Sequence, residues 1–366
     1  MNLPNIALHP TRARCGLFRV FDFRGGRGRV SFRVGHHDLR FLDHLFNIKT
    51  RIRMTAYFSV SGVETWLWLP PLVAFVISFF SSMAGISGAF LLLPFQMSVL
   101  NFTSPSVSST NLVFNLVATP SGIWCYAKEG RMAWPLTWII VLGTLPGVII
   151  GYYVRILYLP DPGQFKLFAG CVLLYIGYRL LSEFAPWKVK SYSTLDEKFK
   201  TQARQASGFS AGLNADATIR VKHISLRMVK YDFWGETFSF STPGMFMLAF
   251  VVGIIGGIYG IGGGAIIAPF CVAIFGLPVY TVAGAALAGT LATSVVGVVA
   301  YSVLPAPAGL PTRPDWLLGL LFGIGGIAGM YLGVRFQKFV PQTVLKMLLG
   351  GILLLLALQY IAASLR

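Results

Sequence analysis

Two glycine-rich motifs are the strongest candidates for a binding site in this sequence. One runs from Gly85 to Pro94 and the other from Gly260 to Pro269, and each has clustered glycines followed by an apolar run. At membrane depth this pattern is typical of an interrupted helix whose second part starts with free backbone N–H groups. Such an N-terminus carries about half a positive charge and binds anions without a basic side chain. The predicted substrate-binding residues are Gly85, Ser87, Gly88, Gly260, Gly262, Gly263 and Gly264, with Pro94 and Pro269 as helix breaks.

Neutral polar side chains follow each motif at helical spacing. Asn111, Asn115 and Thr119 form one stripe, and Thr290 and Ser294 occupy the equivalent positions farther along. Neutral donors suit an anion that must be released, because a buried arginine would hold it tightly and would be expensive in hydrocarbon. We therefore add these five residues to the predicted site. The alternative for the whole set is structural, with glycines that let helices approach and side chains that join them.

The composition shows which elements must carry these residues. Of 366 residues, 55% are hydrophobic and 12% are charged, whereas a soluble domain has about 25% charged residues. An ordinary soluble enzyme is excluded, and an all-α polytopic membrane protein is predicted. The second and seventh segments are shorter than the about 20 residues that a crossing needs, so each is expected to be part of a broken helix. The ten apolar segments are 66–84, 86–100, 106–127, 135–155, 164–182, 243–259, 261–275, 280–303, 316–335 and 343–363.

The ten segments form two tandem repeats of five. At an offset of 175 residues, Gly85, Gly88 and Pro94 fall on Gly260, Gly263 and Pro269. Leu112, Leu116, Gly122 and Tyr126 match Leu287, Leu291, Gly297 and Tyr301 in the same register. Duplication of a membrane unit is the common plan of secondary transporters. Each half also has a ridge of three glycines spaced four residues apart, which we interpret as a packing surface. The ridges are Gly143, Gly147 and Gly151, and Gly325, Gly329 and Gly333.

The distribution of basic residues predicts the orientation. With five crossings per repeat, the loops 128–134, 183–241 and 335–346 lie inside and carry net charges of +1, +3 and +3. This satisfies the positive-inside rule, and because five is odd the repeats are inverted. Four crossings per repeat, with parallel repeats, is the competing arrangement.

Four regions follow from this organisation. Residues 1–53 are a basic leader with net charge +8, either an RNA- or lipid-binding arm or an extension upstream of a start at Met54, and we expect it to be dispensable. Residues 64–182 and 243–363 are the two transmembrane repeats. Residues 183–242 are a basic cytoplasmic linker in which 219–240 suggest a small strand or hairpin. The predicted location is the inner membrane, with multiple passes.

Several kinds of chemistry have no residues to support them. The four cysteines form no CxxC pair, and four of the five histidines lie in the leader. No carboxylate lies within a predicted span. We therefore predict no metal, no cofactor, no enzymatic activity and no nucleic-acid partner. The predicted partners are a small anion and the lipid bilayer, while the oligomeric state, the exact anion, the direction and the coupling ion are left open.

The paired motifs resemble the sulfite exporter TauE/SafE family of membrane permeases. The resemblance covers about residue 66 to the C-terminus and is most specific at Gly257-Ile258-Tyr259-Gly260-Ile261-Gly262-Gly263-Gly264 with Pro269, and at Ala285, Leu287, Gly289, Thr290 and Ser294. The first repeat departs from this pattern at Ser87, Ala89 and Asn115. The resemblance implies export of sulfite, organosulfonates or related sulfur-containing anions. The alternatives are a non-transporting assembly factor or scaffold and, less favoured, a membrane-embedded enzyme.

Overall fold

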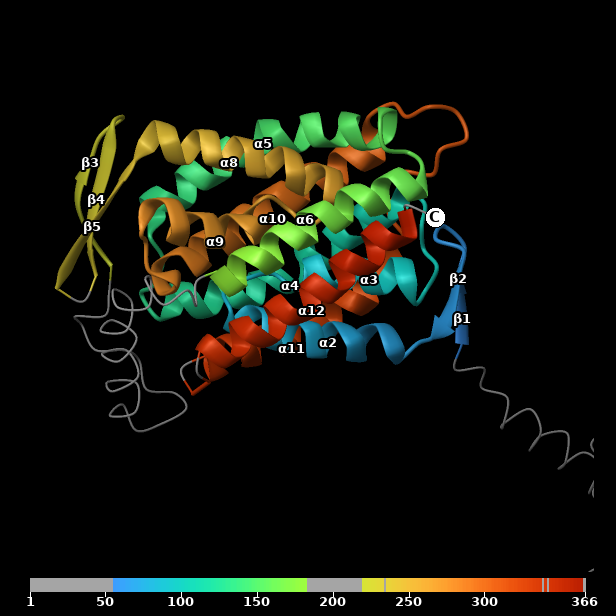
Figure 1. Ribbon diagram of the computed structural model, residues 1–366, viewed down its shortest axis with the longest axis horizontal. Helices are drawn as coiled ribbons and strands as arrows, with labels where there is room; N and C mark the ends of the chain where they lie inside the picture. Colours follow the sequence, from blue (N-terminus) through green and yellow to red (C-terminus); the bar gives the residue numbers. More distant parts are fainter. Residues whose placement is uncertain (1–54, 183–218, 234, 338, 341, 365–366) are drawn as a thin grey trace, which may run out of the picture. The chain divides into compact units, whose positions relative to one another are not determined.

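The computed structural model describes residues 55–182, 219–233, 235–337, 339–340 and 342–364. The predictions for residues 1–53 and for most of the central linker lie outside these described residues. The first group of helices comprises α2 (Leu69–Met83), α3 (Ala89–Ser98), α4 (Ser106–Lys128), α5 (Trp134–Leu157) and α6 (Pro162–Ser182). The second comprises α8 (Thr242–Tyr259), α9 (Gly264–Phe275), α10 (Val279–Val303), α11 (Trp316–Phe336) and α12 (Gln342–Ser364), as Figure 1 shows.

The prediction of a polytopic α-helical membrane protein is confirmed. Six helices of the described part are long and apolar enough to cross a membrane, namely α5, α6, α8, α10, α11 and α12. Each predicted apolar segment corresponds to one helix, with ends that agree within three residues. Helix α4 has 23 residues and a polar sequence. Its serines, threonines and asparagines up to Thr119 are buried, so this first part of α4 lies in the interior of the helix bundle.

The two glycine ridges bring helices of different halves into backbone contact. A β-carbon at Gly325, Gly329 or Gly333 of α11 would collide with carbonyl oxygens of α2, at Pro71, Phe75 and Phe79 respectively. In the same way, a β-carbon at Gly143, Gly147 or Gly151 of α5 would meet the α8 backbone at Phe246, Phe250 and Ile254. Both contacts advance by one turn along both helices at once. Helix α2 is therefore parallel to α11, and α5 is parallel to α8.

Further glycine contacts fix the remaining directions. Helix α4 is parallel to α11, since Gly319 packs on Val113 and Gly323 packs on Val117. Helices α4 and α10 are antiparallel, because Gly297 meets Leu112 whereas Gly122 meets Leu287. Helices α2, α4 and α11 thus begin at one end of the bundle, here called the first end. Helices α5, α8 and α10 begin at the opposite end, here called the second end.

Corresponding helices of the two halves run in opposite directions. Helix α2 corresponds to α8, α4 to α10 and α5 to α11 in the sequence alignment of the halves, and each pair is antiparallel. This is the geometry that inverted repeats require. That the halves arose as repeats of one another stays a prediction from the sequence.

The short helices α3 and α9 run back toward the end from which the preceding helix came. Helices α2 and α4 are parallel, so α3 between them must return to the first end. At the second end, Gly244 near the start of α8 lies close to Phe275 at the end of α9, and the sulfur atoms of Met245 and Cys271 are 3.6 Å apart. With 10 and 12 residues, α3 and α9 are about 15–18 Å long, which is about half the hydrocarbon thickness. The pairs α2–α3 and α8–α9 therefore form helical hairpins that enter from opposite ends.

Two small antiparallel sheets lie at the ends of the bundle (Figure 1). Strands β1 (Thr55–Phe58) and β2 (Val63–Trp66) form a hairpin whose Ser61 hydroxyl donates to Asp315 Oδ2 at 2.8 Å. This hairpin was not expected, and the first helix starts at Leu69 instead of residue 66 because the residues before it pair as strands.

Three strands form the second sheet, in the region where a strand or hairpin was expected. They are β3 (Arg220–Ile224), β4 (Met228–Phe233) and β5 (Glu236–Ser241), paired in the order β3-β4-β5. The buried Tyr231 hydroxyl lies 2.9 Å from Thr281 Oγ1 near the start of α10, which fastens the sheet to the second end. Burial raises the pKa of this phenol. The Lys222 ammonium, 2.6 Å from Asp232 Oδ2, lowers the pKa of that carboxyl.

Candidate functional site

Glycine is required in the two turns for backbone conformation as well as for space. Gly85, Gly260 and Gly262 have φ angles of 73°, 81° and 74°, a left-handed region that costs other residues free energy. Gly88 and Gly263 are the N-cap residues of α3 and α9, with φ of −65° and −57°, so other residues could adopt their backbone conformation. Among the described non-glycine residues only Asn101 has a positive φ. The serine at position 87, where the second half has Gly262, is therefore unstrained.

Two asparagines of α4 each contact both glycine turns. Asn111 Nδ2 donates to the Ala89 carbonyl and to the Gly260 carbonyl, both at 3.0 Å. Asn115 Nδ2 donates to the Ile261 carbonyl at 2.8 Å, and its Oδ1 accepts from the Ser87 hydroxyl at 2.5 Å. The asparagines thus bring the two predicted motifs together from opposite halves. Their own hydrogen-bonding groups are occupied within the protein, so their first role is to join the turns.

The joined turns lie against the first halves of α4 and α10, from Ser108 to Asn115 and from Val279 to Thr293. Residues 112–122 of α4 face residues 287–297 of α10, as the contacts of Gly297 and Gly122 establish. Asn115 lies in the centre of this stretch, and Thr290 and Thr293 lie in the facing stretch. From here α3 runs toward the first end and α9 toward the second end. The two asparagines thus bring the starts of both short helices together between α4 and α10. Each N-terminus contributes about half a positive charge there.

Side-chain oxygens cap the two N-termini differently. The Gly263 N–H donates to Thr293 Oγ1 at 3.1 Å, and the Ala89 N–H donates to Ser87 Oγ at 3.3 Å. Thr293 was missed in the sequence because it lies next to the predicted stripe instead of on it. The Thr119 and Thr290 hydroxyls donate to Asn115 and Ala286 carbonyls of their own helices.

Among the described residues, three buried hydroxyls near the turns have no hydrogen-bond partner, those of Ser78, Ser81 and Ser294. Ser294 was predicted, and its Oγ is fully buried without a partner. Ser78 of α2 was not predicted as a site residue. Its unpartnered Oγ lies next to the first turn, 3.1 Å from the position of a β-carbon on Gly88. Its counterpart in the second half is Gly253, so the repeat gave no signal for it. Each hydroxyl can donate one hydrogen bond to a bound anion.

Close packing also explains several of the predicted glycines. A β-carbon on Gly264 would collide with the Ala286 carbonyl, and one on Gly260 would collide with the Ser108 backbone. A β-carbon on Gly85 would lie 2.8 Å from Ala283, the residue that matches Ser108 at the repeat offset. Each turn thus packs on the long central helix of the other half. At Gly88 and Gly263 the nearest atoms belong to side chains, at 3.1 and 2.9 Å. Close packing therefore accounts for Gly85, Gly260 and Gly264, whereas the binding role predicted for the glycines of both turns stays a prediction.

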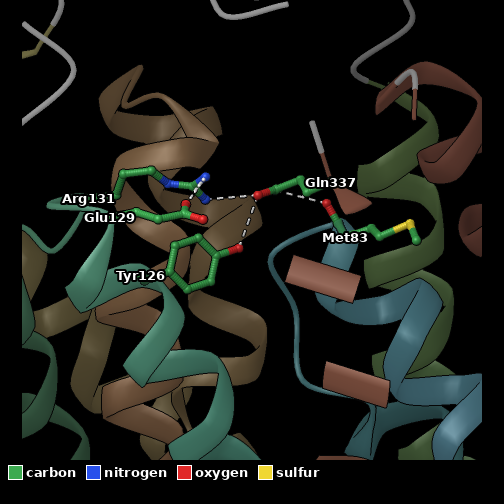
Figure 2. A network of polar contacts seen from close by, with 5 residues as sticks. All are labelled: Met83, Tyr126, Glu129, Arg131 and Gln337. Carbon is green, nitrogen blue, oxygen red and sulfur yellow. Dashed lines mark hydrogen bonds and ion pairs between the residues drawn. The ribbon is translucent and has the colours of Figure 1, made fainter. Parts of the chain in front are cut away.

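A second buried network holds the end of α2, just before the first turn (Figure 2). Gln337 after α11 donates from Nε2 to the Met83 carbonyl at 2.9 Å. Its Oε1 accepts from Arg131 Nη2 at 2.9 Å and from the Tyr126 hydroxyl at 3.3 Å. Arg131 also pairs with Glu129 at 3.0 Å and lies over the Tyr126 ring. This network joins the α4–α5 loop, the end of α11 and the end of α2 at the second end, so it ties the two halves together beside Gly85.

No group of three or more histidine, cysteine, aspartate or glutamate side chains is arranged to hold a metal ion in the described part of the chain. The candidate site consists of backbone N–H groups, hydroxyls and amides. Such groups recognise a ligand by hydrogen bonds and partial charges.

Comparison with known proteins gives the same classification along nearly the whole bundle. The family described as "Sulfite exporter TauE/SafE" matches residues 71–360. The "Probable membrane transporter protein YunE" of Bacillus subtilis (strain 168) is 23% identical over 289 residues, which cover 76% of this chain and 92% of that protein.

A second relative matches over a shorter stretch. The "Probable membrane transporter protein YdhB" of the same organism is 30% identical over 112 residues, or 31% of this chain and 43% of that protein. No solved structure matches this chain significantly. The match to the family spans both helix groups and both glycine turns, and the chain therefore belongs to the sulfite exporter TauE/SafE family of membrane transporters.

Proposed function

We propose that the protein transports a small oxyanion, with sulfite or an organosulfonate as the substrate, across the inner membrane. The observation that supports the proposal is that Asn111 and Asn115 bring the starts of two short helices, α3 and α9, together between α4 and α10. Asn111 and Asn115 hold them together, and the Ser78 and Ser294 hydroxyls have no partner. An oxyanion bound between the N-termini would accept from their N–H groups and from these hydroxyls.

The charge at this place suits a singly charged ligand. Two N-termini together supply about one elementary positive charge, which balances one negative charge without a basic side chain. Partial charges bind less tightly than a guanidinium at contact distance, so the anion can be released. Neutral donors also avoid the cost of a permanent charge in hydrocarbon.

The hairpins provide a way to expose the site to each side in turn. Hairpin α2–α3 enters from the first end and α8–α9 from the second end, and the turns of both lie at the site. Movement of one hairpin relative to α4 and α10 would open the path to one end, and movement of the other would open the opposite path. A negative cell interior drives a singly charged anion outward by about 2.3 kcal/mol per 100 mV. We therefore infer export as the direction.

Counterflow in liposomes tests the function. The full chain would be reconstituted in vesicles loaded with unlabelled sulfite, methanesulfonate, thiosulfate or sulfate, and uptake of the labelled anion would be measured. We expect uptake of sulfite, as its hydrogensulfite monoanion, or of the sulfonate above the level of protein-free vesicles, with the dianions thiosulfate and sulfate taken up less. Absence of counterflow for all four anions, with correctly inserted protein, would refute the proposal.

A further inference from the structure

Arg155, in the last turn of α5, is a fully buried cation that the sequence analysis did not single out. Its side chain is 0% exposed, and Cζ lies 3.7 Å from the centre of the Phe165 ring. Nη1 donates to the Leu159 carbonyl, and Nε lies 3.5 Å from Ser108 Oγ. The second terminal nitrogen, Nη2, has no hydrogen-bond partner.

Within the described ranges no aspartate or glutamate lies within ion-pair distance of Arg155. The nearest acid along the chain, Asp161, instead accepts from the N–H groups of Gly163 and Gln164 at the start of α6. A buried charge without a counter-ion is strongly unfavourable, and ionisable side chains at membrane depth commonly mark the path of a substrate.

A structural role explains only part of the geometry. The bond to the Leu159 carbonyl satisfies an acceptor at the C-terminal end of α5, where a cation is favourable. An arginine with that role alone would normally extend its head to the water at the end of the span. Arg155 turns inward instead, and Phe165 covers one face of its guanidinium. The edge that carries Nη2 is the part left for a ligand.

The position of Arg155 connects it to the glycine turns. Its neighbour Ser108 lies at the start of α4, at the first end, and the backbone of Ser108 packs directly on Gly260. Ser108 precedes Asn115 by seven residues, or about 10 Å along the helix. An anion that moves between the turns and the first end would therefore have to pass close to this guanidinium.

We propose that Arg155 binds the oxyanion on the first-end side of the glycine turns, through Nη2 with Ser108 Oγ beside it. The inference rests on the proposed function and adds a second, charged binding site to the transport path. A guanidinium presents adjacent N–H groups in a plane and so matches two oxygens of a sulfite, sulfonate or carboxylate group. Because one end of the path has this cation and the central site has only partial charges, the two directions of approach differ in affinity.

That asymmetry provides the test. Transport of labelled sulfite would be measured in right-side-out and inside-out vesicles for the wild type, R155Q, R155K and the control R313Q. Arg313 is an exposed arginine at the same end, and its backbone carbonyl accepts from Ser106 of α4. We expect R155Q to raise the KM from the first-end side about 10- to 100-fold, as for loss of a charge-assisted hydrogen bond. From the second-end side its KM should change less than about threefold.

The other variants separate recognition from folding and from surface charge. R155K keeps the charge but loses the planar pair of donors, so its KM from the first-end side should lie between those of the wild type and R155Q. R313Q should behave as the wild type on both sides. R155M should melt no lower than the wild type without anion, because it removes an uncompensated buried charge.

The outcomes distinguish the two proposals. If the wild type transports no oxyanion, the proposed function fails and this inference fails with it. If the wild type transports sulfite but R155Q keeps a normal KM on both sides, or changes it equally on both, only the role of Arg155 is refuted. A melting temperature of R155M well below that of the wild type would likewise assign the residue to the structural role.

Discussion

At the scale of single residues, the two glycine turns contain positions with different requirements. A methyl group at Gly88 or Gly263 would first meet side chains of α2 and α5 at 3.1 and 2.9 Å, with backbone atoms no nearer than 3.1 Å. One at Gly264 would collide with the α10 backbone. The site and the packing surface can therefore be separated by the smallest possible substitution.

Gly88→Ala and Gly263→Ala should each lower sulfite counterflow at least about tenfold, because the added methyl group occupies the space next to the N–H groups that would bind the anion. Both variants should be recovered as folded protein. Gly264→Ala should instead reduce the yield of folded protein, since the α9–α10 contact cannot relax. Normal counterflow in the first two variants would show that these N-termini do not bind the substrate.

Asn115→Asp should abolish oxyanion transport, since it places a carboxylate between the two N-termini and removes the N–H donor to Ile261. Initial rates of counterflow would measure the effect, expected to exceed about 100-fold. Asn101→Asp makes the same chemical change at an exposed loop position, and its transport should stay close to that of the wild type. Equal rates for the two variants would contradict a site at Asn115.

At the scale of elements, helices and turns of each half pack against helices of the other half. The α2–α3 turn packs on α10 and the α8–α9 turn packs on α4, while the glycine ridges join α5 to α8 and α11 to α2. Neither half therefore has a complete packing surface alone. The network around Gln337 adds a polar link of the same kind at the second end.

Gln337→Leu should lower the free energy of unfolding by about 1–3 kcal/mol, because the Met83 carbonyl and the Tyr126 hydroxyl lose a buried partner. Thermal melting of the detergent-solubilised protein would measure it. Tyr126→Phe is the matched control, since it removes a single 3.3 Å bond and keeps the ring beneath Arg131. Equal melting temperatures for Gln337→Leu and the wild type would mean that the network does not stabilise the contact between halves.

At the scale of the whole molecule, the directions of the helices show that the two described sheets lie at opposite ends of the bundle. The β1–β2 hairpin lies at the first end and the β3–β5 sheet at the second. Lys128, Arg131 and Arg335 also lie at the second end, so the positive-inside rule predicts that this end faces the cytoplasm. A single orientation thus accounts for the charges and for the helix directions.

Cysteine labelling tests this orientation in a chain whose native cysteines are replaced. Leu226→Cys, at a 91% exposed position in the turn between β3 and β4, should resist an impermeant thiol reagent in intact cells and react after lysis. Ala308→Cys, exposed in the α10–α11 loop, should react in intact cells. The opposite pattern would reverse the predicted orientation, and equal reaction of both would refute the arrangement of ends.

The sequence by itself determined the membrane class, the ten apolar segments, the family and the two glycine motifs. Each of these depends on composition or on local spacing. A long apolar run must be buried in lipid, and clustered glycines before an apolar run indicate a turn that needs positive φ. The polar stripe was also readable, because residues three or four apart share one face of a helix.

Only the tertiary structure decided which partners these residues have. Asn111 and Asn115 contact carbonyls about 146 to 149 residues away, and Thr293 caps Gly263 although it lies off the stripe. The burial of Arg155 could not be read from its place at the end of an apolar run, where arginines normally reach water. Its surroundings come from α4 and α6, which pack around it only after the helices assemble. Sequence spacing determines which face of its helix a residue occupies, whereas the packing of helices distant in sequence determines which residues that face contacts.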